Sequence, residues 1–302
     1  MSLVFVIDSL HAGSSYIRGI LPVKGLKKDN VDARFEVASK FNPSAVSSED
    51  TVVFVKYDRL GQSSDVKKSG ARVILDVIDS KKHWKLHRDN LDGLIVNTDT
   101  QMRIIRSRDK FIKPIFKIPH IITNFNSDLS GQVRKELPKK IKNIGYMGVD
   151  KTFSGMNDFI KFSQENNLKW YTSQPSIHSN ESETLRLDLG CIYYVGDEER
   201  IGGTISISKP SAKLINLFSY GIPALFSPYE SYLDAIAHTG HTDLLWCCCN
   251  TKEAMFDKIR ILMDNFDLYK NLSDQAFQMS RYFHISNTTN IYKSLIEYSD
   301  KK

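Results

Sequence analysis

The amino-acid sequence predicts an α/β protein with two parallel β-sheets, one in each half of the chain. Short apolar runs such as residues 3–7 (LVFVI) and 51–55 (TVVFV) alternate with polar turns and helix-forming stretches. Nearly continuous apolar strands are typical of a parallel sheet that helices cover on both faces. A polar stretch, residues 124–142, interrupts the alternation, which starts again at Asn143. A length of 302 residues is enough for two domains with separate cores.

The first half of the chain consists of repeated strand, turn and helix signals. Residues 72–78 (RVILDVI), for example, form an apolar run that is followed by an acid, Asp79. We expect strands at residues 3–7, 34–38, 51–55, 72–78, 91–96 and 114–118. We expect helices at residues 16–21, 65–69 and 98–108.

The second half repeats this pattern after the polar stretch. Its strands are expected at residues 143–147, 168–172, 187–195, 222–226 and 244–248. Its helices are expected at residues 156–166, 212–220, 229–237, 251–264 and 268–298. The sequence therefore predicts two alternating α/β units of similar size.

Composition and charge narrow the classes of partner. The chain has 41 basic and 35 acidic residues, and its formal charge of +6 permits a nucleotide, a membrane surface or nucleic acid. No stretch approaches the roughly 20 apolar residues of a membrane helix, and the first residues lack the basic start of a secretory signal. Cys191 and the run 247–249 are interpreted as reduced strand residues of a cytoplasmic protein, with no metal site.

The first candidate site follows the first predicted strand, because open parallel sheets bind ligands beyond the carboxyl ends of their strands. In the sequence SLHAGSS, Gly13 permits close approach to the backbone and Ser14 lies where a helix would begin. His11 adds a titratable group. A turn capped by Ser14 or Ser15 explains the same residues equally well.

The second candidate site follows the strand at residues 143–147. Gly148 would let the backbone approach a diphosphate, and Lys151 would neutralise part of its charge. The alternative is a tight connection from strand to helix with a solvated lysine.

The third candidate site is the most informative and spans residues 202–225. A glycine-containing loop leads to Ser211, which is positioned to cap a helix and so to direct its free amides toward an anion. Lys209 and Lys213 lie four residues apart and would share one helix face. Two lysines on one face repel each other unless an anion lies between them, so we favour a binding site over solvated lysines.

The segment KPSAKLINLFSYGIPALFSP (residues 209–228) resembles the donor-site segment of GT-B glycosyltransferases. That segment typically has a Ser/Asn–Lys pair, an apolar helix with an acid, and the pattern A-x-G-x-P-V-I. Other family-like pieces follow in the expected order, namely KIPHIITNFN, NIGYMGVDK and LDLGCIYYV, the last containing Asp188. The chain is most similar to retaining, Glu-x7-Glu-type group 1 or family 4-like members, with the acidic positions replaced.

This resemblance implies a GT-B architecture, in which two Rossmann-like parallel-sheet domains face a cleft and the C-terminal helices return to the first domain. Residues 1–125 would form the acceptor-side domain, and residues 126–142 the linker. Residues 143–285 would bind the nucleotide sugar, and a final helix at residues 286–302 would pack on the first domain.

The resemblance also assigns roles to residues. Ser211 and Lys213 would bind the diphosphate of the donor. Asn216 stands where the family carries the acid that bonds the ribose hydroxyls, and Ser208 stands where it carries the earlier acid of the Glu-x7-Glu pattern. The full set of expected donor-binding residues is Gly13, Ser14, Gly148, Lys151, Lys209, Ser211, Lys213, Asn216, Tyr229, Glu230 and Ser231.

The implied reaction transfers a sugar from a nucleotide-diphosphate donor to a hydroxyl of a glycan, lipid-linked or small-molecule acceptor. Lysines and helix N-termini can stabilise the departing diphosphate without a metal, so no cofactor is expected. The expected catalytic residues are His11, Asp79 and Lys213. His11 or Asp79 would act as the base if the reaction inverts the sugar, and a retaining reaction needs none.

Two alternatives keep the same fold. The first is a DNA-base glycosyltransferase, but the lysines of residues 135–142 are not interleaved with aromatic residues, so nucleic acid is disfavoured. A basic surface would also suit peripheral contact with an anionic membrane. The second is a catalytically silent nucleotide-sugar-binding protein, which Asn216 favours because it lacks the usual charge.

Overall fold

The computed structural model describes residues 1–58, 60–78, 83–125, 128–148, 153–173, 184–194 and 210–297. These residues form two compact units. Unit 1 contains the described residues of Met1–Ile121 and His284–Lys302 together with Pro210. Unit 2 contains the described residues of Ile122–Ser206 and Ser211–Phe283. The C-terminal helix therefore belongs to the same unit as the N-terminus.

Unit 1 is built on a six-stranded parallel sheet, which confirms the fold class predicted for the first half of the chain. Its strands are β1 (Leu3–Ile7), β2 (Ala33–Val37), β3 (Thr51–Val55), β4 (Arg72–Asp76), β5 (Gly93–Val96) and β6 (Ile115–Lys117). Their spatial order is β2-β1-β3-β4-β5-β6, and Leu3 pairs with both Ala33 and Thr51. The order reverses between β1 and β3, so the residues just beyond these two strands occupy the position where such sheets bind ligands.

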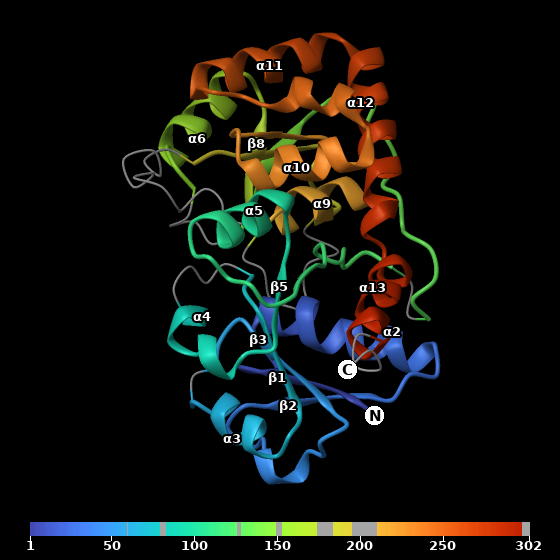
Figure 1. Cartoon of the computed structure of the whole chain (residues 1–302). Coiled ribbons are helices and arrows are strands. Elements are labelled where there is room, and N and C mark those ends of the chain that lie inside the picture. Colours follow the sequence, from blue (N-terminus) through green and yellow to red (C-terminus); the bar gives the residue numbers. More distant parts are fainter. Residues whose placement is uncertain are drawn as a thin grey trace. The chain divides into compact units, whose positions relative to one another are not determined.

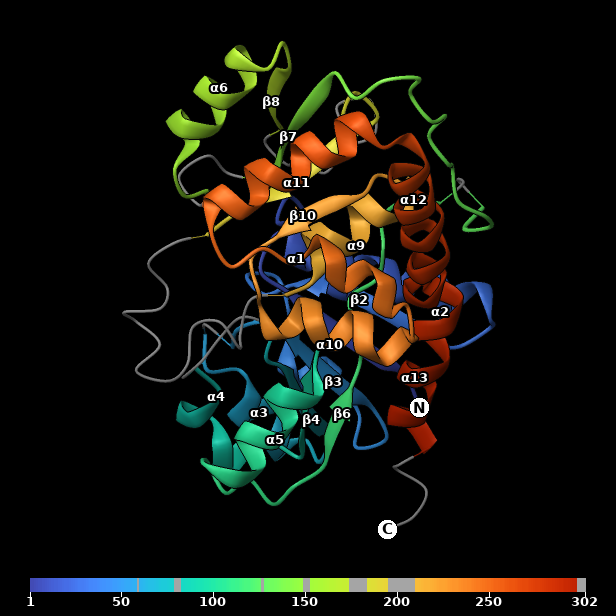
Figure 2. The ribbon, with the colours of Figure 1, turned by 90° about the horizontal axis from the view of Figure 1, so that it is seen from above.

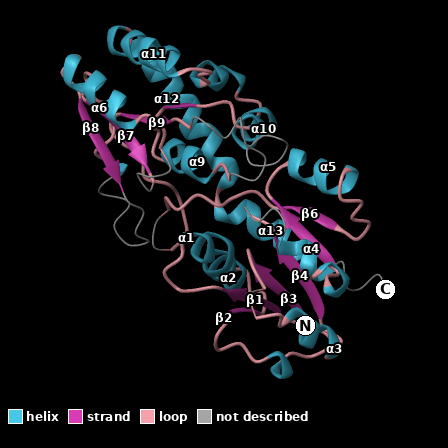
Figure 3. Cartoon of the chain, turned by 90° about the vertical axis from the view of Figure 1, so that its left-hand side faces the viewer, coloured by secondary structure: helices cyan, strands magenta, loops and turns pink. Residues whose placement is uncertain are grey.

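Helices cover both faces of this sheet (Figure 3). Leu3, Phe5 and Ile7 pack in one buried cluster, whereas Val4 and Val6 belong to another. Both faces of β1 are thus apolar, as its continuous run LVFVI requires. The helical elements of unit 1 are α1 (Gly13–Ser15), a π-helical turn (Tyr16–Ile20), α2 (Leu21–Lys28), α3 (Ser63–Lys68), α4 (His83–Leu86), α5 (Asp99–Ser107), α13 (Ile285–Glu297) and 3-10 turns at Pro43–Ala45 and Arg88–Asn90.

The C-terminal helix α13 packs directly along α2 (Figure 1). A Cβ atom at Gly25 would lie 2.6 Å from the Oγ1 of Thr289, so glycine at this position lets the two helices approach. The Lys293 ammonium and the Asp29 carboxylate form an ion pair of 2.8 Å at the end of the contact. Tyr292 then reaches the sheet, where its ring meets the edge of Phe5 at 5.4 Å.

The helix predicted at residues 16–21 was too short. Helical structure runs from Gly13 to Lys28, because the π-helical turn leads directly into α2. Proline cannot donate a backbone hydrogen bond. In the structure Pro22 is the second residue of α2 and follows directly on the π-helical turn.

Unit 2 is built on a four-stranded parallel sheet with the order β10-β9-β7-β8. Its strands are β7 (Asn143–Met147), β8 (Lys169–Ser173), β9 (Leu189–Ile192) and β10 (Ala224–Phe226). Its helices are α6 (Met156–Glu165), α9 (Ala212–Ser219), α10 (Glu230–Thr239), α11 (Lys252–Asp264) and α12 (Phe266–Ser280), with 3-10 turns at Thr242–Cys247 and Arg281–Phe283. Helices α9 and α12 lie side by side (Figure 2).

The strand predicted at residues 244–248 was wrong. These residues belong to the 3-10 helix Thr242–Cys247, and only an isolated bridge joins Cys248 to Phe226. Leu244 and Cys247 are both fully buried, and a spacing of three residues matches the three residues per turn of a 3-10 helix. A short apolar run cannot distinguish this arrangement from a buried strand.

The polar stretch before Asn143 contains no helix or strand in its described part, residues 128–142. Side chains nevertheless fix it to unit 2. The Asn124 amide donates to the carbonyls of Val133 and Ser219, both at 2.7 Å. Lys135 forms an ion pair of 2.7 Å with Asp188, whose other oxygen accepts from the backbone N–H groups of Lys142 and Asn143.

Candidate functional site

The candidate site of unit 2 is organised around Lys213, in the first turn of α9. Its ammonium donates to the hydroxyl of Tyr194 at 2.7 Å and to the hydroxyl of Tyr146. It also lies over both rings, 4.6 Å from the Tyr146 centroid and 5.3 Å from the Tyr194 centroid. The two hydroxyl oxygens are 3.1 Å apart. Lys213 is therefore held by two phenol groups and by cation–π attraction.

Strand topology explains why these three side chains meet. Tyr146 lies near the end of β7, and Tyr194 follows the end of β9. Strands β7 and β9 are neighbours, and β8 and β10 lie on opposite sides of this pair, so the strand order reverses here. Open parallel sheets bind ligands outside the carboxyl ends of strands at such a reversal. The Lys213 ammonium therefore occupies the expected ligand position of unit 2.

Gly148, the first residue after β7, is part of the same arrangement. A Cβ atom there would lie 2.5 Å from the hydroxyl oxygen of Tyr146, far inside van der Waals contact. A side chain at this position would displace the Tyr146 hydroxyl from Lys213. The structure thus brings together two residues that the sequence predicted separately, Gly148 and Lys213.

The Tyr194 phenol stays protonated at any ordinary pH. Burial, with the neighbouring Tyr232 and Tyr146, raises the pKa of Tyr194 far above its usual value. Because neither Tyr146 nor Tyr194 carries a carboxylate charge, neither hydrogen bond cancels the positive charge of Lys213. An anion that approached this ammonium would meet an undiminished charge from these two partners.

Tyr229, Glu230 and Ser231 extend the site along the start of α10. The Tyr229 ring meets the edge of Tyr194 at 5.2 Å. One carboxylate oxygen of Glu230 and the hydroxyl of Ser231 are buried without a hydrogen-bond partner among the described residues. Buried polar atoms usually have a partner, so these two groups are suited to accept one from a ligand or water.

Ser211 precedes α9, and Asn216 lies within this helix. Ser211 is the N-cap residue, as predicted, but its side chain makes no capping hydrogen bond. The Asn216 oxygen accepts from both the backbone N–H and the hydroxyl of Thr123, at 2.7 and 2.9 Å, and its amide donates to the Ala212 carbonyl at 2.8 Å. Asn216 thus fastens α9 to the segment at Thr123, and its predicted bond to a ribose hydroxyl stays a prediction.

The candidate residues of unit 1 lie beyond β1, at the reversal between β1 and β3. His11 is exposed, and its backbone N–H donates to the Ser9 hydroxyl at 3.2 Å. Gly13 is exposed, with nothing within 4 Å of the position that a Cβ would take. The N-cap residue of the helix is Ala12 and not Ser14 or Ser15, because the helix already begins at Gly13.

Three predicted site residues lie outside the described residues, namely Asp79, Lys151 and Lys209.

A second polar cluster in unit 1 was missed by the sequence analysis. Arg18, in the π-helical turn, forms a fully buried ion pair of 2.7 Å with Asp76 at the end of β4. It also donates to the carbonyls of Ile118 and Pro119. The next residue, His120, and Tyr292 of α13 are buried as well. Nη2 of Arg18, both ring nitrogens of His120 and the Tyr292 hydroxyl have no hydrogen-bond partner among the described residues. The π-helical turn brings Arg18 into this cluster, and the periodicity of the sequence does not reveal such a turn.

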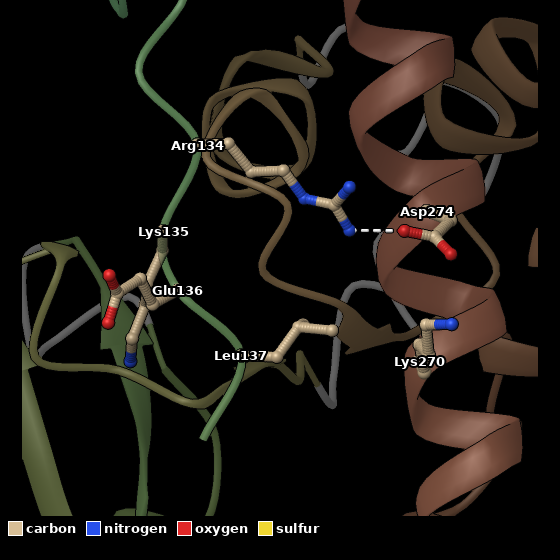
Figure 4. Close-up of a pocket in the computed structure, with 6 residues that line it drawn as sticks. All are labelled: Arg134, Lys135, Glu136, Leu137, Lys270 and Asp274. Carbon is tan, nitrogen blue, oxygen red and sulfur yellow. Dashed lines mark hydrogen bonds and ion pairs between the residues drawn. The ribbon is translucent and has the colours of Figure 1, made fainter. Parts of the chain in front are cut away.

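A groove of about 420 Å³ runs between the segment at residues 134–137 and α12 (Figure 4). Arg134 reaches across it to Asp274 on α12, while Glu136 points away from that helix. Arg134 also lies over the Phe277 ring. The groove is therefore bridged by an ion pair that fastens the polar stretch to α12, and none of the residues predicted to bind the donor lines it.

Neither a metal cluster nor a membrane-spanning helix is present among the described residues. No group of three or more His, Cys, Asp or Glu side chains in this part of the chain is arranged to hold a metal ion. No helix in it combines the length and the apolar character needed to cross a bilayer.

No protein-family model matches the sequence, and a search of the curated proteins found no match. Solved structures do match. The structure described as trehalose-6-phosphate from E. coli bound with UDP-2-fluoro glucose has a TM-score of 0.62 and 10% identity, over 98% of this chain and 99% of that one. T4 phage BGT in complex with UDP and Mn2+ has a TM-score of 0.57 and 9% identity, and the match covers 98% of this chain and 100% of that one.

The pneumococcal O-GlcNAc transferase GtfA in complex with UDP and GlcNAc has a TM-score of 0.56 and 13% identity. The match covers 85% of this chain and 58% of that one, so this chain spans less than two thirds of the length of GtfA. All identities are low, and the likeness is one of fold. With two parallel-sheet units and a C-terminal helix that belongs to the first of them, the chain has the GT-B fold found in glycosyltransferases.

Proposed function

We propose that the protein is a glycosyltransferase that moves a sugar from a nucleotide-diphosphate donor to an acceptor hydroxyl. One observation carries the proposal: the Lys213 ammonium is held by Tyr146 and Tyr194 at the strand reversal of unit 2. A fixed positive charge at a helix start, beside the carboxyl ends of parallel strands, suits a diphosphate.

The proposed chemistry needs little from the protein beyond positioning and charge. The bond between the anomeric carbon and the diphosphate oxygen breaks, a bond to the acceptor oxygen forms, and the acceptor hydroxyl loses a proton. Lys213 would stabilise the negative charge that develops on the departing diphosphate. The free amides at the start of α9 would add to this, so we propose that no metal ion or other cofactor is needed.

The fate of the acceptor proton depends on the stereochemistry. An inverting transfer would need a base, for which His11 and Asp79 are the candidates. His11 is exposed beyond β1, as a base that meets an incoming acceptor should be. A retaining transfer would need neither residue.

We propose a uridine diphosphate sugar as the first donor to test, because three fold neighbours are described with UDP or a UDP sugar. The acceptor would be a hydroxyl of a carbohydrate, a lipid-linked glycan or a small molecule. Ser231 and Glu230, with buried polar atoms that lack partners among the described residues, are candidates to bind the donor sugar.

A second candidate function is a nucleotide-sugar-binding protein without transferase activity. The bonds of Asn216 favour it, because its side-chain oxygen is fully used by Thr123 and the usual acid is absent. This protein would bind the donor at Lys213 and release it unchanged.

A thermal-shift screen of the full chain against nucleotides and nucleotide sugars, with and without EDTA, tests the proposal. A ligand present at 100 times its Kd should stabilise the fold by about 2.7 kcal/mol. Stabilisation by UDP or a UDP sugar in EDTA supports the donor site. Release of UDP from the bound sugar then separates the transferase from the silent binder. Absence of any nucleotide effect, at concentrations where known donors saturate such enzymes, contradicts both.

A further inference from the structure

The two most exposed large apolar side chains of the described residues both lie in unit 1. Ile112 is 87% exposed and Leu86 is 79% exposed. Leu86 ends α4, and Ile112 belongs to the loop between α5 and β6. Single exposed apolar residues are common on protein surfaces. Two that are this exposed, on segments in direct contact, call for a physical explanation.

Several contacts join these two segments. The Trp84 ring meets the edge of the buried Phe111 at 5.4 Å. Arg88 donates to the carbonyls of Asp109 and Lys110, at 3.3 and 2.7 Å. Lys85 and Asp109 form an ion pair between the two segments. We call residues 83–91 and 103–113 together the α4–α5 surface.

The exposure of Ile112 is imposed by the local structure. Arg106 of α5 donates to the carbonyls of Phe111 and Lys113, at 2.7 and 2.8 Å, and so holds the residues on both sides of Ile112. Phe111 points into the core while Ile112 points out. The chain therefore keeps an isoleucine in water at a fixed position, which does nothing for the stability of the fold.

The same surface is strongly basic. Its sequence contains seven lysines and arginines and only two acids, Asp89 and Asp109. Arg88, Arg106 and Lys113 donate to backbone carbonyls, which carry no charge, so these contacts leave the positive charges in place. Much of the formal charge of +6 is thus gathered around two protruding aliphatic side chains.

We propose that the α4–α5 surface binds anionic phospholipid membranes, with Ile112 and Leu86 inserting between lipid chains and the basic side chains meeting the headgroups. Aliphatic residues that enter the interface, surrounded by lysine and arginine, are the features that bind peripheral proteins to anionic bilayers. Nucleic acid fits less well, because the aromatic residues of this surface, Trp84 and Phe111, are buried and cannot stack on bases. This inference does not depend on the proposed transferase activity.

Flotation of the purified full chain with lipid vesicles tests the proposal. One set consists of phosphatidylcholine, and the other of an equal mixture of phosphatidylcholine and phosphatidylglycerol. We expect binding to the anionic vesicles only, and loss of binding in high salt, because each cation near the surface contributes about a fivefold change in affinity.

Two variants and two matched controls identify the surface. The double variant Leu86→Ser/Ile112→Ser should bind anionic vesicles about tenfold more weakly or worse. Arg103→Glu, on the exposed face of α5, should weaken binding at least about fivefold. The controls are Ile261→Ser on α11 and Lys161→Glu on α6, which are also exposed but lie in unit 2. They should bind as the unaltered protein does.

Four results would overturn the proposal. The first is equal binding to both kinds of vesicle, or binding to neither. The second is unchanged vesicle binding by Leu86→Ser/Ile112→Ser. The third is a wild-type protein that forms a dimer at the concentrations used and becomes a monomer in this double variant, because the surface would then be a contact between copies of the chain. Parallel measurements with double-stranded DNA complete the test, since preferential binding to DNA would also contradict it.

Discussion

The Nζ atom of Lys213 lies 2.7 Å from the hydroxyl oxygen of Tyr194. This contact joins the first turn of α9 to the end of β9, and the Tyr146 hydroxyl joins both to the end of β7. Contacts from β7 and β9 thus fix the position of the ammonium group that α9 carries. A charge held in this way is preorganised for an anionic ligand, because little side-chain freedom remains to be lost on binding.

Replacement of Tyr194 by Phe should weaken UDP binding without unfolding the protein. The ring and its packing on Tyr229 remain, but Lys213 loses one hydrogen-bond acceptor that fixes it. Loss of one such bond corresponds to about 1 kcal/mol, or roughly a fivefold rise in Kd. Titration calorimetry with UDP measures this change. The matched control is Tyr282→Phe, whose hydroxyl bonds the exposed His238 in the same unit. Equal UDP affinity in Tyr194→Phe and the unaltered protein would argue against a positioning role for Tyr194.

Asn216→Ala should lower the free energy of unfolding by about 2 kcal/mol. It leaves the backbone N–H and the hydroxyl of the half-buried Thr123 without their acceptor, and an unsatisfied polar group removed from water costs about 1–3 kcal/mol. Urea denaturation measures the change. Asn290→Ala on α13 is the control, because the Asn290 side chain is exposed and accepts a hydrogen bond from the Lys293 ammonium at 3.3 Å. A variant as stable as the control would show that the Asn216–Thr123 contact does not fasten α9.

His120 should make the fold less stable as the pH falls. Burial, and then the charge of Arg18, holds the pKa of His120 well below its ordinary value. The unfolded chain takes up a proton on this side chain near pH 6.5, but the folded chain does so only at lower pH. Below about pH 6.5 the unfolded state therefore binds more protons, and stability falls by up to about 1.4 kcal/mol per pH unit.

His120→Asn should flatten this part of the stability curve. Burial and Lys28 also lower the pKa of His284, so some dependence on pH should remain. Denaturant titrations between about pH 7 and pH 5, a window around the ordinary histidine pKa, measure the slope. The exposed His11→Asn serves as the control. If His120→Asn and His11→Asn keep the same slope, His120 is protonated in the folded protein.

Removal of only one partner of the buried Arg18–Asp76 ion pair in unit 1 should strongly lower the free energy of unfolding. Arg18→Met leaves the Asp76 carboxylate buried without its cation, and breaking such a pair costs about 3–5 kcal/mol. The double variant Arg18→Met/Asp76→Leu removes both charges and should be more stable than the single variant. Thermal unfolding of the three proteins measures this order. A double variant that is less stable than Arg18→Met would contradict this prediction, because the unpaired Asp76 carboxylate would then not be the source of the cost.

The fold was predictable because its strands carry an unambiguous signal. In β1 both faces are buried, so LVFVI has no alternation and reads as a parallel strand. The 3-10 helix Thr242–Cys247 was not predictable, because four apolar residues in a row fit either element. The π-helical turn was equally hidden, because the periodicity of apolar residues does not reveal it.

The candidate site was predictable only in part. The spacing of Ser211 and Lys213 pointed to the start of α9, where the structure has them. Tyr146 and Tyr194 were not chosen, because each lies in an apolar strand run where a tyrosine looks like a core residue. The parallel pairing of β7 with β9 brings the two hydroxyls to the same ammonium. The residues near each tyrosine in the sequence do not predict this long-range pairing.

The central claim is that Lys213 binds the diphosphate of a nucleotide sugar, and calorimetric titration of UDP into Lys213→Ala tests it most directly. A charged hydrogen bond contributes about 1.5–3 kcal/mol, so the Kd should rise roughly tenfold to a hundredfold relative to the unaltered protein. The melting temperature should change far less than the affinity, because Lys213 is only half-buried. The Lys161→Ala control should bind UDP as the unaltered protein does. Equal UDP affinity in Lys213→Ala would contradict the account.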